Sequence, residues 1–496
     1  MSHRIVVVGH GMVAHRFVAE LLAHGLPDVT LTVLGDEPEA AYNRILLPDV
    51  LPGHLDLAGL TLPAHPGVDA RAGVRATAID RGRRVVTDDA GGEHPFDTLV
   101  LATGAAPVFP TIEGLRDSAG QPMPDVTALR SWADAQHIRA AAAEGARVVV
   151  LGGGLLGIEA AVALRRAGCA VTVIHRGGAP LDRQFDALSG RVVAASLADH
   201  GVAVLTDCRI AGIERRWNHA LKSIRLTDDR RIEADLIVVA IGVEPRIELA
   251  ARAELAVRRG VLVDDLCRTD DPDIHAIGDC AQTGRGCQGL VGPGWEQARV
   301  VAHHLAEKIG GRARPRPTLG FDAGVVRLKA DGVDAVTMGA FPVDEFALGA
   351  PRVLGFVDAA GRRRVRIAVA DGVLVGATCV GDPQIAADLT VAFDSRMPVP
   401  ADPAALLARP LAGAAPAASV LDLPDEAVIC RCNAVPKQAI AAAVGGGAAS
   451  VPEVAEVTRA TTGCGSCTND VCRLVEALGA APSAPVTEKE GAFAVA

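Results

Sequence analysis

Aromatic side chains are scarce in this sequence, at 3% of its 496 residues. Few rings are therefore available to stack on unpaired bases, which disfavours single-stranded nucleic acid as a partner. Positive charge is also in deficit, because the formal net charge is -10. A chain with that balance is repelled by phosphate backbones and by anionic membrane surfaces. We expect neither nucleic acid nor a membrane as a partner.

Long apolar runs are missing as well. No stretch approaches the roughly 20 apolar residues that span a bilayer, and the N-terminal run from Ile5 to Gly9 is far too short for a signal-peptide core. A cytoplasmic location is expected, where thiols stay reduced. The 11 cysteines therefore call for an explanation other than a disulfide framework. None lies before Cys169, and five crowd between Cys430 and Cys472.

The N-terminal segment has the pattern of a dinucleotide-binding turn. A buried parallel strand over Ile5–Val8 leads into Gly9-His-Gly11, and helix-forming residues follow to Leu22, with Ala14 at the third-glycine position. Such a turn lets the backbone approach a pyrophosphate at the positive end of the helix. The next strand, Val29–Leu34, ends at Gly35-Asp36-Glu37, where a carboxylate can accept ribose hydroxyls. The alternative is a plain glycine turn with a solvated acidic loop.

The same pattern recurs in the middle of the chain. A strand over Arg147–Leu151 precedes Gly152, Gly154 and Gly157, and a helix carrying Glu159 follows. The next strand, Ala170–Ile174, ends in His175-Arg176 rather than in an acid. An Arg there can pair with a 2'-phosphate, whereas NAD sites usually place a carboxylate against the free 2'-hydroxyl. The sequence therefore allows NADP as well as NAD.

Two further segments connect these turns into one flavin enzyme. One is a strand, Thr98–Ala102, ending in Thr103-Gly104, and the other is a strand, Ile274–Ile277, ending in Gly278-Asp279. With the two glycine turns they resemble the glutathione-reductase-like superfamily of two-dinucleotide flavoprotein oxidoreductases. The resemblance implies that the NAD(P)H domain is inserted in the FAD domain, that strands near Ile237–Ile241 close it, and that the chain returns around Glu244-Pro245.

The segment at which cysteine-dependent relatives carry a reactive thiol has none here. It reads Ala41-Tyr42-Asn43-Arg44-Ile45-Leu46-Leu47-Pro48, so a thiolate relay beside the flavin is not available. Cys280 follows Asp279 directly, and we interpret it as a packing residue. Electrons must leave the flavin by another route.

A cysteine cluster near the C-terminus offers that route. Cys430 and Cys432 form C-x-C, and Cys464 and Cys467 form C-x2-C, each pair with a helix expected after it. This arrangement closely resembles the [2Fe-2S] domain of bacterioferritin-associated ferredoxin, which implies the four cysteines as cluster ligands. A structural four-cysteine zinc site is the alternative, although zinc pairs are usually separated by two to four residues. Cys472 is interpreted as a packing residue on the following helix.

Several short segments narrow the family. AYNRILL, LRSWADA, LDRQFD, GDCAQ and GWEQAR resemble the diaphorase part of the NAD(P)H nitrite reductase large subunit and the electron-transfer subunit of assimilatory nitrate reductase. The resemblance implies FAD contacts from Asp36, Arg44 and Arg130, and a place near the nicotinamide for Glu159. The full set expected at FAD is Gly9, Gly11, Met12, Val13, Ala14, Asp36, Glu37, Arg44, Ala102, Thr103, Gly104, Arg130, Gly278, Asp279 and Glu296. The set expected at NAD(P) is Gly152, Gly154, Leu155, Leu156, Gly157, Glu159, His175, Arg176 and Gly242.

These patterns predict an α/β fold of the two-dinucleotide-binding flavoprotein class, with an α+β C-terminal domain and a small helical [2Fe-2S] domain. Residues 319–410 alternate apolar runs with Gly turns, which predicts an antiparallel sheet with a covering helix. The family resemblance implies that a C-terminal domain of this kind shields the flavin and supports dimers. The expected boundaries are 1–115 and 245–318 for the FAD domain, 116–244 for the NAD(P)H domain, 319–410 for the α+β domain, 411–427 for a linker, 428–478 for the cluster domain and 479–496 for a disordered tail.

The functional hypothesis follows from this arrangement. We expect NAD(P)H to give a hydride to FAD, and the flavin to pass single electrons through the cluster to a nitrate or nitrite reductase. Beyond Cys472 there is no segment for siroheme and [4Fe-4S], so we expect this chain to deliver electrons rather than to reduce nitrite. Two alternatives stay open: a ferredoxin- or rubredoxin-reductase-like flavoprotein, and a flavoprotein whose four cysteines hold zinc in a docking module.

Overall fold

The computed structural model describes residues 2–479 apart from Pro27, His54, 311–316, 318, 320–323, 408–419, 431, 432, 434 and 463–466. The chain divides into two units, Met1–Ala414 and Ala415–Ala496. The boundary lies inside the predicted linker, most of which is outside the described residues, as is the predicted tail from residue 480. The described cysteines are all free thiols. Within the described ranges, no helix is both long enough and apolar enough to cross a bilayer.

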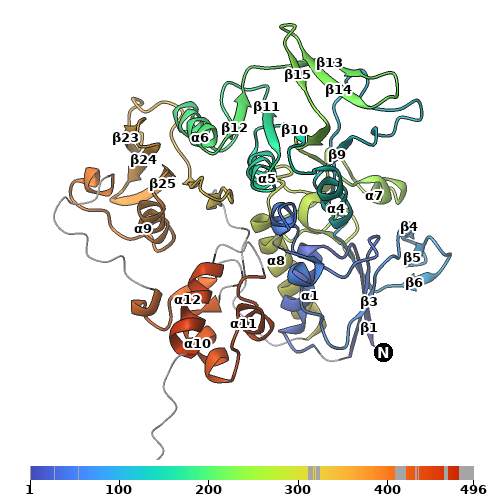
Figure 1. The fold of residues 1–496 in the computed structure, drawn as a ribbon. Coiled ribbons are helices and arrows are strands. Elements are labelled where there is room, and N and C mark those ends of the chain that lie inside the picture. The colour runs from blue at the N-terminus through green and yellow to red at the C-terminus, as the bar shows by residue number, and fades with distance from the viewer. Residues whose placement is uncertain are drawn as a thin grey trace, which may run out of the picture. The chain divides into compact units, whose positions relative to one another are not determined.

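The N-terminal part is built on a parallel sheet in the order β19-β7-β1-β2-β3. Its strands are β1 (His3–Val8), β2 (Val29–Leu34), β3 (Asp69–Arg71), β7 (Thr98–Leu101) and β19 (Ile274–Ala276). Val, Ile and Leu dominate the central strands because both faces are covered. On one face α1 (Met12–Leu22) lies beside α8 (Val291–Ile309) (Figure 1), and Phe17, Val18, Leu21, Val301 and Leu305 fill the space between them and the sheet.

A second parallel sheet repeats this plan in the order β12-β11-β10-β16-β9. Its strands are β9 (Val126–Ala128), β10 (Arg147–Leu151), β11 (Ala170–Ile174), β12 (Val202–Leu205) and β16 (Leu236–Val239), and its helices are α4 (Trp132–Ala141), α5 (Leu155–Arg166) and α6 (Ala187–Asp199). In both sheets the strand before the glycine turn, β1 or β10, is central and has parallel neighbours on both sides. Strand β19 comes after the second sheet in the sequence but pairs with β7 of the first, so the segment that forms the second sheet is inserted between two strands of the first.

Each parallel sheet also carries a small antiparallel meander. The first is β4 (Ala76–Asp80), β5 (Val85–Asp88) and β6 (Glu93–Pro95), and the second is β13 (Ile210–Arg215), β14 (Leu221–Leu226) and β15 (Arg231–Glu233). The chain returns to the first domain through β17 (Val243–Pro245), which pairs with β8 (Ala105–Pro107). The shorter elements of this part are α2 (Leu47–Val50), α3 (Leu57–Leu60), α7 (Glu248–Arg252), β18 (Val261–Leu262) and β20 (Ala281–Gln282).

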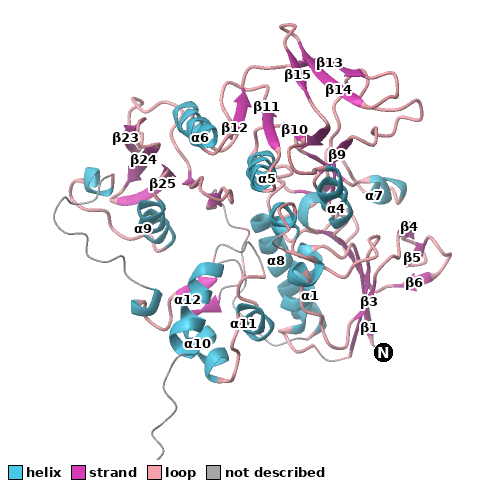
Figure 2. Ribbon diagram, in the orientation of Figure 1, coloured by secondary structure: helices cyan, strands magenta, loops and turns pink. Residues whose placement is uncertain are grey.

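The region after α8 is the predicted antiparallel sheet with one covering helix. Figure 2 shows its strands as a magenta layer beside α9 (Pro383–Asp394). The strand order is β21-β22-β25-β24-β23, with bounds β21 (Val326–Arg327), β22 (Ala335–Gly339), β23 (Arg352–Asp358), β24 (Arg363–Ala370) and β25 (Val373–Val380). Ile385, Ala386 and Leu389 of the helix pack on this sheet.

The second unit is small and mainly helical. It contains a short hairpin, β26 (Val428–Cys430) and β27 (Val435–Pro436), followed by α10 (Lys437–Gly445), α11 (Val451–Thr458) and α12 (Thr468–Gly479). Its own apolar core includes Ile440, Val454, Val471 and Leu474. Helices follow both cysteine pairs as expected, and α11 between them was not anticipated.

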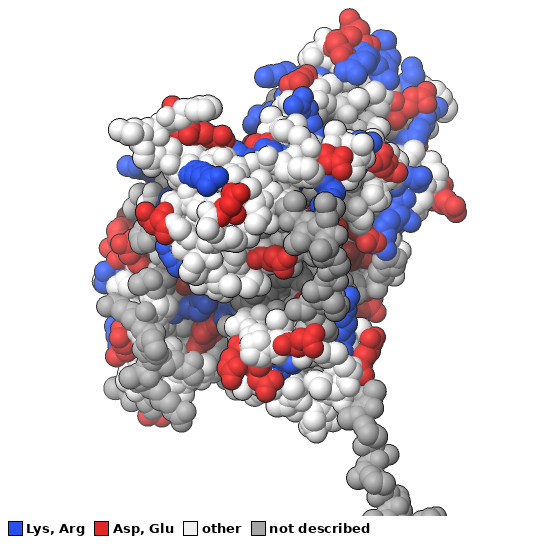
Figure 3. Space-filling view, turned by 90° about the vertical axis from the view of Figure 1, so that its left-hand side faces the viewer, with Lys and Arg blue, Asp and Glu red and all other residues white. Residues whose placement is uncertain are grey.

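Charge is distributed without a strong field on the face that Figure 3 shows. Acidic and basic side chains are interspersed there, with wide uncharged areas between them. Neither sign covers the described residues of this face continuously, so the net charge of -10 is not gathered on it.

Candidate functional site

The first glycine turn lies where β1 meets α1, at the carboxyl edge of the parallel sheet. Gly9 has φ +109°, and a Cβ at this position would lie 2.1 Å from the carbonyl oxygen of Ala102. Gly11 is the N-cap of α1 and provides no side chain to satisfy the helix terminus. The turn is therefore a cradle of bare backbone at a helix N-terminus, which suits a pyrophosphate. This fits the FAD that the sequence predicts there.

Residues predicted at FAD from distant segments converge on this turn. Val13, in the first turn of α1, lies against the predicted Gly278, where a Cβ would be 3.3 Å from Val13 Cγ2. It also lies against Gly294, two residues before the predicted Glu296, where a Cβ would be only 2.7 Å away. The backbone N–H of Gly278 donates to Gln297 Oε1 of α8 at 2.7 Å. Met12 and Ala14 are buried in the same turn, and Glu296 is half-buried in α8. Gln297 was not among the predicted residues, although it adjoins Glu296 in GWEQAR.

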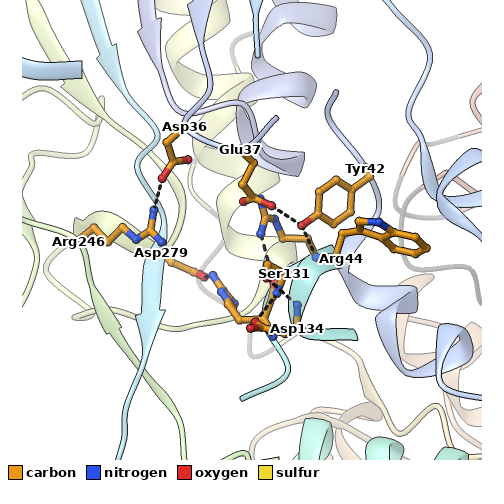
Figure 4. Close-up of polar contacts among 10 residues, drawn as sticks. Asp36, Glu37, Tyr42, Arg44, Ser131, Asp134, Arg246 and Asp279 are labelled. Carbon is orange, nitrogen blue, oxygen red and sulfur yellow. Dashed lines mark hydrogen bonds and ion pairs between the residues drawn. The ribbon is translucent and has the colours of Figure 1, made fainter. Parts of the chain in front are cut away.

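The acids beside the turn are each paired with an arginine, as Figure 4 shows. Asp36 accepts from Arg246 Nη1 at 2.9 Å, and Asp279 accepts from Arg130 Nη2 at 2.6 Å. Glu37 pairs with Arg44. Every charged residue that the sequence predicts at FAD, apart from Glu296, is thus in this network. Arg246 was missed, because the sequence marks it only by its position directly after the chain return at Pro245.

A tyrosine connects this network to the helix that follows it. The hydroxyl of Tyr42 donates to Glu37 Oε2 at 2.5 Å and accepts from the backbone N–H of Trp132 at 2.9 Å. Tyr42 is 2% exposed, and burial raises the pKa of its phenol above the ordinary value, so the group stays a donor.

Helix α4 starts beside this network with a complete capping box. Ser131 is the N-cap, and its side chain accepts from the Asp134 N–H while Asp134 accepts from the Ser131 N–H. Asp134 also accepts from the backbone N–H of Arg130 at 2.9 Å. The backbone of Arg130 is therefore held in place on both sides, because Arg44 Nη1 also donates to its carbonyl at 3.2 Å.

The Thr103-Gly104 segment follows β7 and is hydrogen-bonded to Arg246, directly after the strand β17 by which the chain returns to the first domain. Thr103 Oγ1 donates to the carbonyl of Arg246 at 2.9 Å, and the Arg246 N–H donates to the carbonyl of Gly104 at 3.0 Å. Ala102, directly after the strand, supplies the carbonyl that lies against Gly9. Strands β7 and β19 end one residue earlier than predicted, which leaves Ala102 and Ile277 outside the sheet.

The second glycine turn, between β10 and α5, has the same construction. Gly152 has φ +115°, and a Cβ there would lie 2.4 Å from the carbonyl oxygen of Ala240, while one at Gly157 would lie 1.9 Å from the carbonyl oxygen of Gly152. Gly154 is the N-cap of α5 and makes no side-chain cap. Leu155 and Leu156 begin the helix half-buried. Gly242 lies at the same sheet edge, after β16, with φ +123° and open space where a Cβ would stand.

Glu159 lies on α5 and is 9% exposed. Its Oε1 accepts from the backbone N–H of Lys329 at 3.0 Å, so the segment between β21 and β22 contacts this carboxyl group. Burial raises the pKa of this carboxyl to about 7. The contact with Lys329 joins segments 170 residues apart, and no local pattern in the sequence indicates it.

No thiol in the described part of the chain replaces the missing redox cysteine near Tyr42. Cys280 is fully buried, its Sγ donates to the Ile277 carbonyl at 3.2 Å, and burial raises the pKa of the thiol. The packing role predicted for Cys280 fits these contacts.

Two of the four predicted cluster ligands lie in the described part of the second unit. Cys430 ends β26 and Cys467 immediately precedes α12; both are buried in the same apolar core. Asn433, after the first pair, donates to Thr462 Oγ1 at 3.0 Å and to the Arg459 carbonyl at 2.5 Å, which holds the two cysteine loops together. Cys432 and Cys464 lie outside the described residues, so the four-thiolate set stays a prediction.

Cys472 differs from its predicted role. The residue is half-exposed on α12 rather than packed in the core, and its Sγ donates to Glu476 Oε1 at 3.3 Å. Its position four residues before Glu476 places both side chains on the outer face of the helix.

Two known protein families match the sequence of this chain. Residues 3–304 match the family described as pyridine nucleotide-disulphide oxidoreductase. The chain belongs to this family. Residues 428–477 match the BFD-like [2Fe-2S] binding domain, which supports the cluster and sets the zinc alternative aside. The two matches confirm the predicted cofactors, FAD, NAD(P)H and a [2Fe-2S] cluster, and the predicted class of NAD(P)H-dependent oxidoreductase.

Several curated proteins are similar to this family member over almost its whole length. The nitrite reductase [NAD(P)H] of Bacillus subtilis is 31% identical over 94% of this chain and 56% of that protein. The assimilatory nitrate reductase electron transfer subunit of the same organism is 30% identical over 94% of this chain and 58% of that protein. The large subunit of NADH nitrite reductase from Escherichia coli is 32% identical over 96% of this chain and 55% of that protein. The chain thus spans about half the length of these relatives.

Solved structures show the same fold. The covalent putidaredoxin reductase–putidaredoxin complex is similar with TM-score 0.69 and 24% identity, covering 82% of this chain and 96% of that one. A ferredoxin reductase from Rhodopseudomonas palustris is similar with TM-score 0.67 and 24% identity, covering 78% of this chain and 92% of that one. The predicted two-dinucleotide flavoprotein fold is therefore confirmed.

Proposed function

We propose that this family member takes a hydride from NAD(P)H onto FAD and passes single electrons through its [2Fe-2S] cluster to a protein acceptor. The observation that carries this proposal is the pair of bare glycine turns, at Gly9 and Gly152, each at the carboxyl edge of its own parallel sheet. Two dinucleotides are thus accommodated in one unit, and a thiolate-rich domain follows on the same chain. Bound FAD supplies the change from two-electron to one-electron transfer.

The residues of the chain position the dinucleotides in this proposal and need not act as acid or base. The arginines Arg44 and Arg130 hold positive charge beside the first turn, and Asp36 and Asp279 offer acceptors for hydroxyl groups. Glu159 is buried on α5, the helix that follows the second turn, and the family resemblance implies a role for it near the nicotinamide. Each residue named for these sites remains a prediction.

Nitrate or nitrite reductase is the acceptor that we propose. Its support is the similarity to the nitrate reductase electron transfer subunit and the nitrite reductases over at least 94% of this chain. A smaller acceptor such as rubredoxin is the second candidate, because a rubredoxin-NAD(+) reductase of Pseudomonas putida is 41% identical over 41% of this chain. A cytoplasmic location and a homodimer, both expected from the sequence, stay predictions.

Anaerobic titration of purified, cofactor-loaded protein tests the proposal. NAD(P)H is expected to bleach the flavin absorption first and then to give the electron paramagnetic resonance signal of a reduced [2Fe-2S] cluster. A one-electron dye should be reduced catalytically. If flavin-loaded protein did not oxidise either nicotinamide, the proposed function would be wrong. Comparing purified nitrate reductase with rubredoxin as the final acceptor separates the two candidates.

A further inference from the structure

The loop after β11 occupies the place at which a dinucleotide fold meets the adenosine ribose. Backbone hydrogen bonds fix it on two sides. The His175 N–H donates to the Leu205 carbonyl at 2.8 Å, and the Cys208 N–H donates to the His175 carbonyl at 3.1 Å. The Leu181 N–H donates to the Gly153 carbonyl at 2.7 Å. Backbone hydrogen bonds thus join the loop to the second glycine turn and to the end of β12.

His175 stands where an NAD site usually has a carboxylate. The residue is 9% exposed, and its Nδ1 accepts from the backbone N–H of Gly153 at 3.2 Å. This contact assigns the ring proton of the neutral form to Nε2. In the described part of the chain Nε2 makes no hydrogen bond, although Asp182 Oδ2 lies 3.3 Å away. The strand end therefore offers a buried donor, whereas NAD sites usually place an accepting carboxylate against the free 2'-hydroxyl.

The arginines of this loop differ from those at the first glycine turn. Arg44, Arg130 and Arg246 each pair with a carboxylate. Arg176 and Arg183 are exposed, and neither makes an ion pair or hydrogen bond among residues that the structure describes. Two unpaired guanidinium groups in the loop that also carries His175 suit a phosphate, with which Arg forms paired hydrogen bonds.

Two carboxylates near the loop argue for the opposite preference. The side chain of Asp182 is 45% exposed, and a Cβ at Gly177 would lie 2.2 Å from its Oδ2. The Asp207 N–H donates to the Gly177 carbonyl at 2.9 Å, which places that acid on the neighbouring loop. Either acid could accept hydroxyls of an unphosphorylated ribose. Asp182 already faces the His175 ring, however, and the loop holds two unpaired cations.

We propose that this loop selects NADPH over NADH, with Arg176 pairing with the 2'-phosphate and His175 Nε2 donating to it. The inference rests on the proposed function, since it names the nicotinamide donor of that reaction. Asp182 then orients His175 rather than the ribose. Arg183 adds positive charge at the rim of the same loop.

Rapid-mixing kinetics of flavin reduction test this with the full-length holoenzyme. The unmodified protein is expected to show a higher kcat/KM with NADPH than with NADH. Arg176→Ala should lower kcat/KM for NADPH about 10- to 100-fold, the range of a charged hydrogen-bonded contact, and leave NADH almost unchanged. Arg191→Ala is the matched control, because Arg191 is another exposed arginine, on α6 of the same domain, and it should leave the ratio unaltered.

Two more variants separate the roles of the acid and the histidine. His175→Glu should shift the preference toward NADH by restoring an acceptor at the strand end. Asp182→Asn should lower kcat/KM for NADPH, because the His175 ring loses the carboxylate that orients it. A protein that prefers NADH and loses that preference in Asp182→Asn would overturn the inference and assign Asp182 to the ribose.

A binding measurement keeps this inference distinct from the proposed function. Calorimetry of the holoenzyme with adenosine 2',5'-bisphosphate and with adenosine 5'-monophosphate needs no hydride transfer. Tighter binding of the bisphosphate, lost in Arg176→Ala, supports the inference even if no nicotinamide reduces the flavin, in which case only the proposed function fails. Equal binding of both nucleotides, with active flavin reduction, would refute the inference and leave the function intact.

Discussion

At the residue scale, the two turns require glycine for two reasons: the backbone conformation and the close approach of a carbonyl oxygen. Gly9 and Gly152 both have positive φ and would press a Cβ into a carbonyl oxygen, at 2.1 and 2.4 Å respectively. Gly91 also has positive φ, at +82°, but has nothing within 4 Å of a Cβ. A comparison of alanine at Gly9 and at Gly91 therefore separates the cost of the steric contact from the cost of the left-handed backbone conformation.

Gly9→Ala is therefore expected to abolish FAD retention, because the turn must open to relieve the contact with Ala102. Gly91→Ala should cost about 1 kcal/mol, the left-handed conformation alone, and keep its flavin. The ratio of flavin absorption to protein in each purified variant checks this. Equal flavin content in both variants would show that the Gly9 turn does not hold the pyrophosphate.

Glu159 is the residue whose protonation is coupled most plainly to the fold. Its pKa rises from 4.5 to about 7 on burial. Below pH 4.5 the carboxyl is neutral in both states, and its burial carries no charge penalty. Between that pH and about 7 the unfolded chain releases a proton that the fold retains, so stability falls as pH rises, by about 3 kcal/mol in total.

Glu159→Gln should remove this part of the pH dependence. We expect its melting temperature to change less than that of the unmodified protein between pH 5 and 8, and to exceed it at the upper end, because no buried carboxylate forms. Thermal unfolding followed by circular dichroism across this range measures the effect. Glu254→Gln, at an exposed position, is the control and should follow the unmodified protein. Parallel curves for Glu159→Gln and the control would contradict the assignment.

At the scale of elements, the segment around η1 (Arg44–Leu46) is held to the start of α4 by the phenol of Tyr42 and by Arg44, which donates to the Arg130 carbonyl. Tyr42 both donates to Glu37 and accepts from the Trp132 N–H. Burial of Tyr42 stabilises the fold little unless both of these hydrogen bonds form. A buried amide such as the Trp132 N–H costs about 1–3 kcal/mol when it has no acceptor.

Tyr42→Phe keeps the ring and removes both hydrogen bonds. We expect a loss of about 1–3 kcal/mol in unfolding free energy, since the Trp132 N–H loses its acceptor, and faster FAD dissociation, since Glu37 and Arg44 lose a support. Denaturant unfolding and the rate of flavin release into excess buffer report the two effects. A variant with unchanged stability and unchanged flavin release would show that the phenol is not part of the FAD support.

At the scale of the whole molecule, the chain consists of two units with separate cores. The first, to Ala414, contains both parallel sheets and the antiparallel sheet, and the second contains the cysteine loops. The proposed function therefore assigns hydride transfer to the first unit and storage of single electrons to the second. Changes in the second unit should leave the first unit's chemistry intact.

Cys430→Ser is expected to remove the cluster's visible absorption and its reduced-state paramagnetic signal while flavin content and flavin reduction by NAD(P)H persist. Cys472→Ser should keep both, because Cys472 is half-exposed and bonds to Glu476. Iron content per chain, measured beside flavin content, checks this. Full iron in Cys430→Ser would exclude this thiol as a ligand, and loss of iron in Cys472→Ser would add an unexpected one.

The sequence by itself determined the strands and helices around the two glycine turns, whereas α11 and the two small meanders were not anticipated. The strands predicted over Val29–Leu34, Arg147–Leu151 and Ala170–Ile174 have those bounds in the structure, because buried parallel strands are short segments rich in Val, Ile and Leu. The antiparallel sheet, its helix and the cysteine domain could also be predicted from the sequence, because hydrophobic periodicity and cysteine spacing are local properties of the chain. The family resemblance supplied the cofactors.

Only the tertiary structure decided which distant side chains meet. Arg246 pairs with Asp36 across 210 residues, Gln297 holds the N–H of Gly278, and Lys329 covers Glu159. The same holds for the tautomer of His175, which depends on the backbone of Gly153. Such contacts depend on how the strand ends of two sheets are brought together, and no periodicity along the chain encodes a distance between segments that far apart.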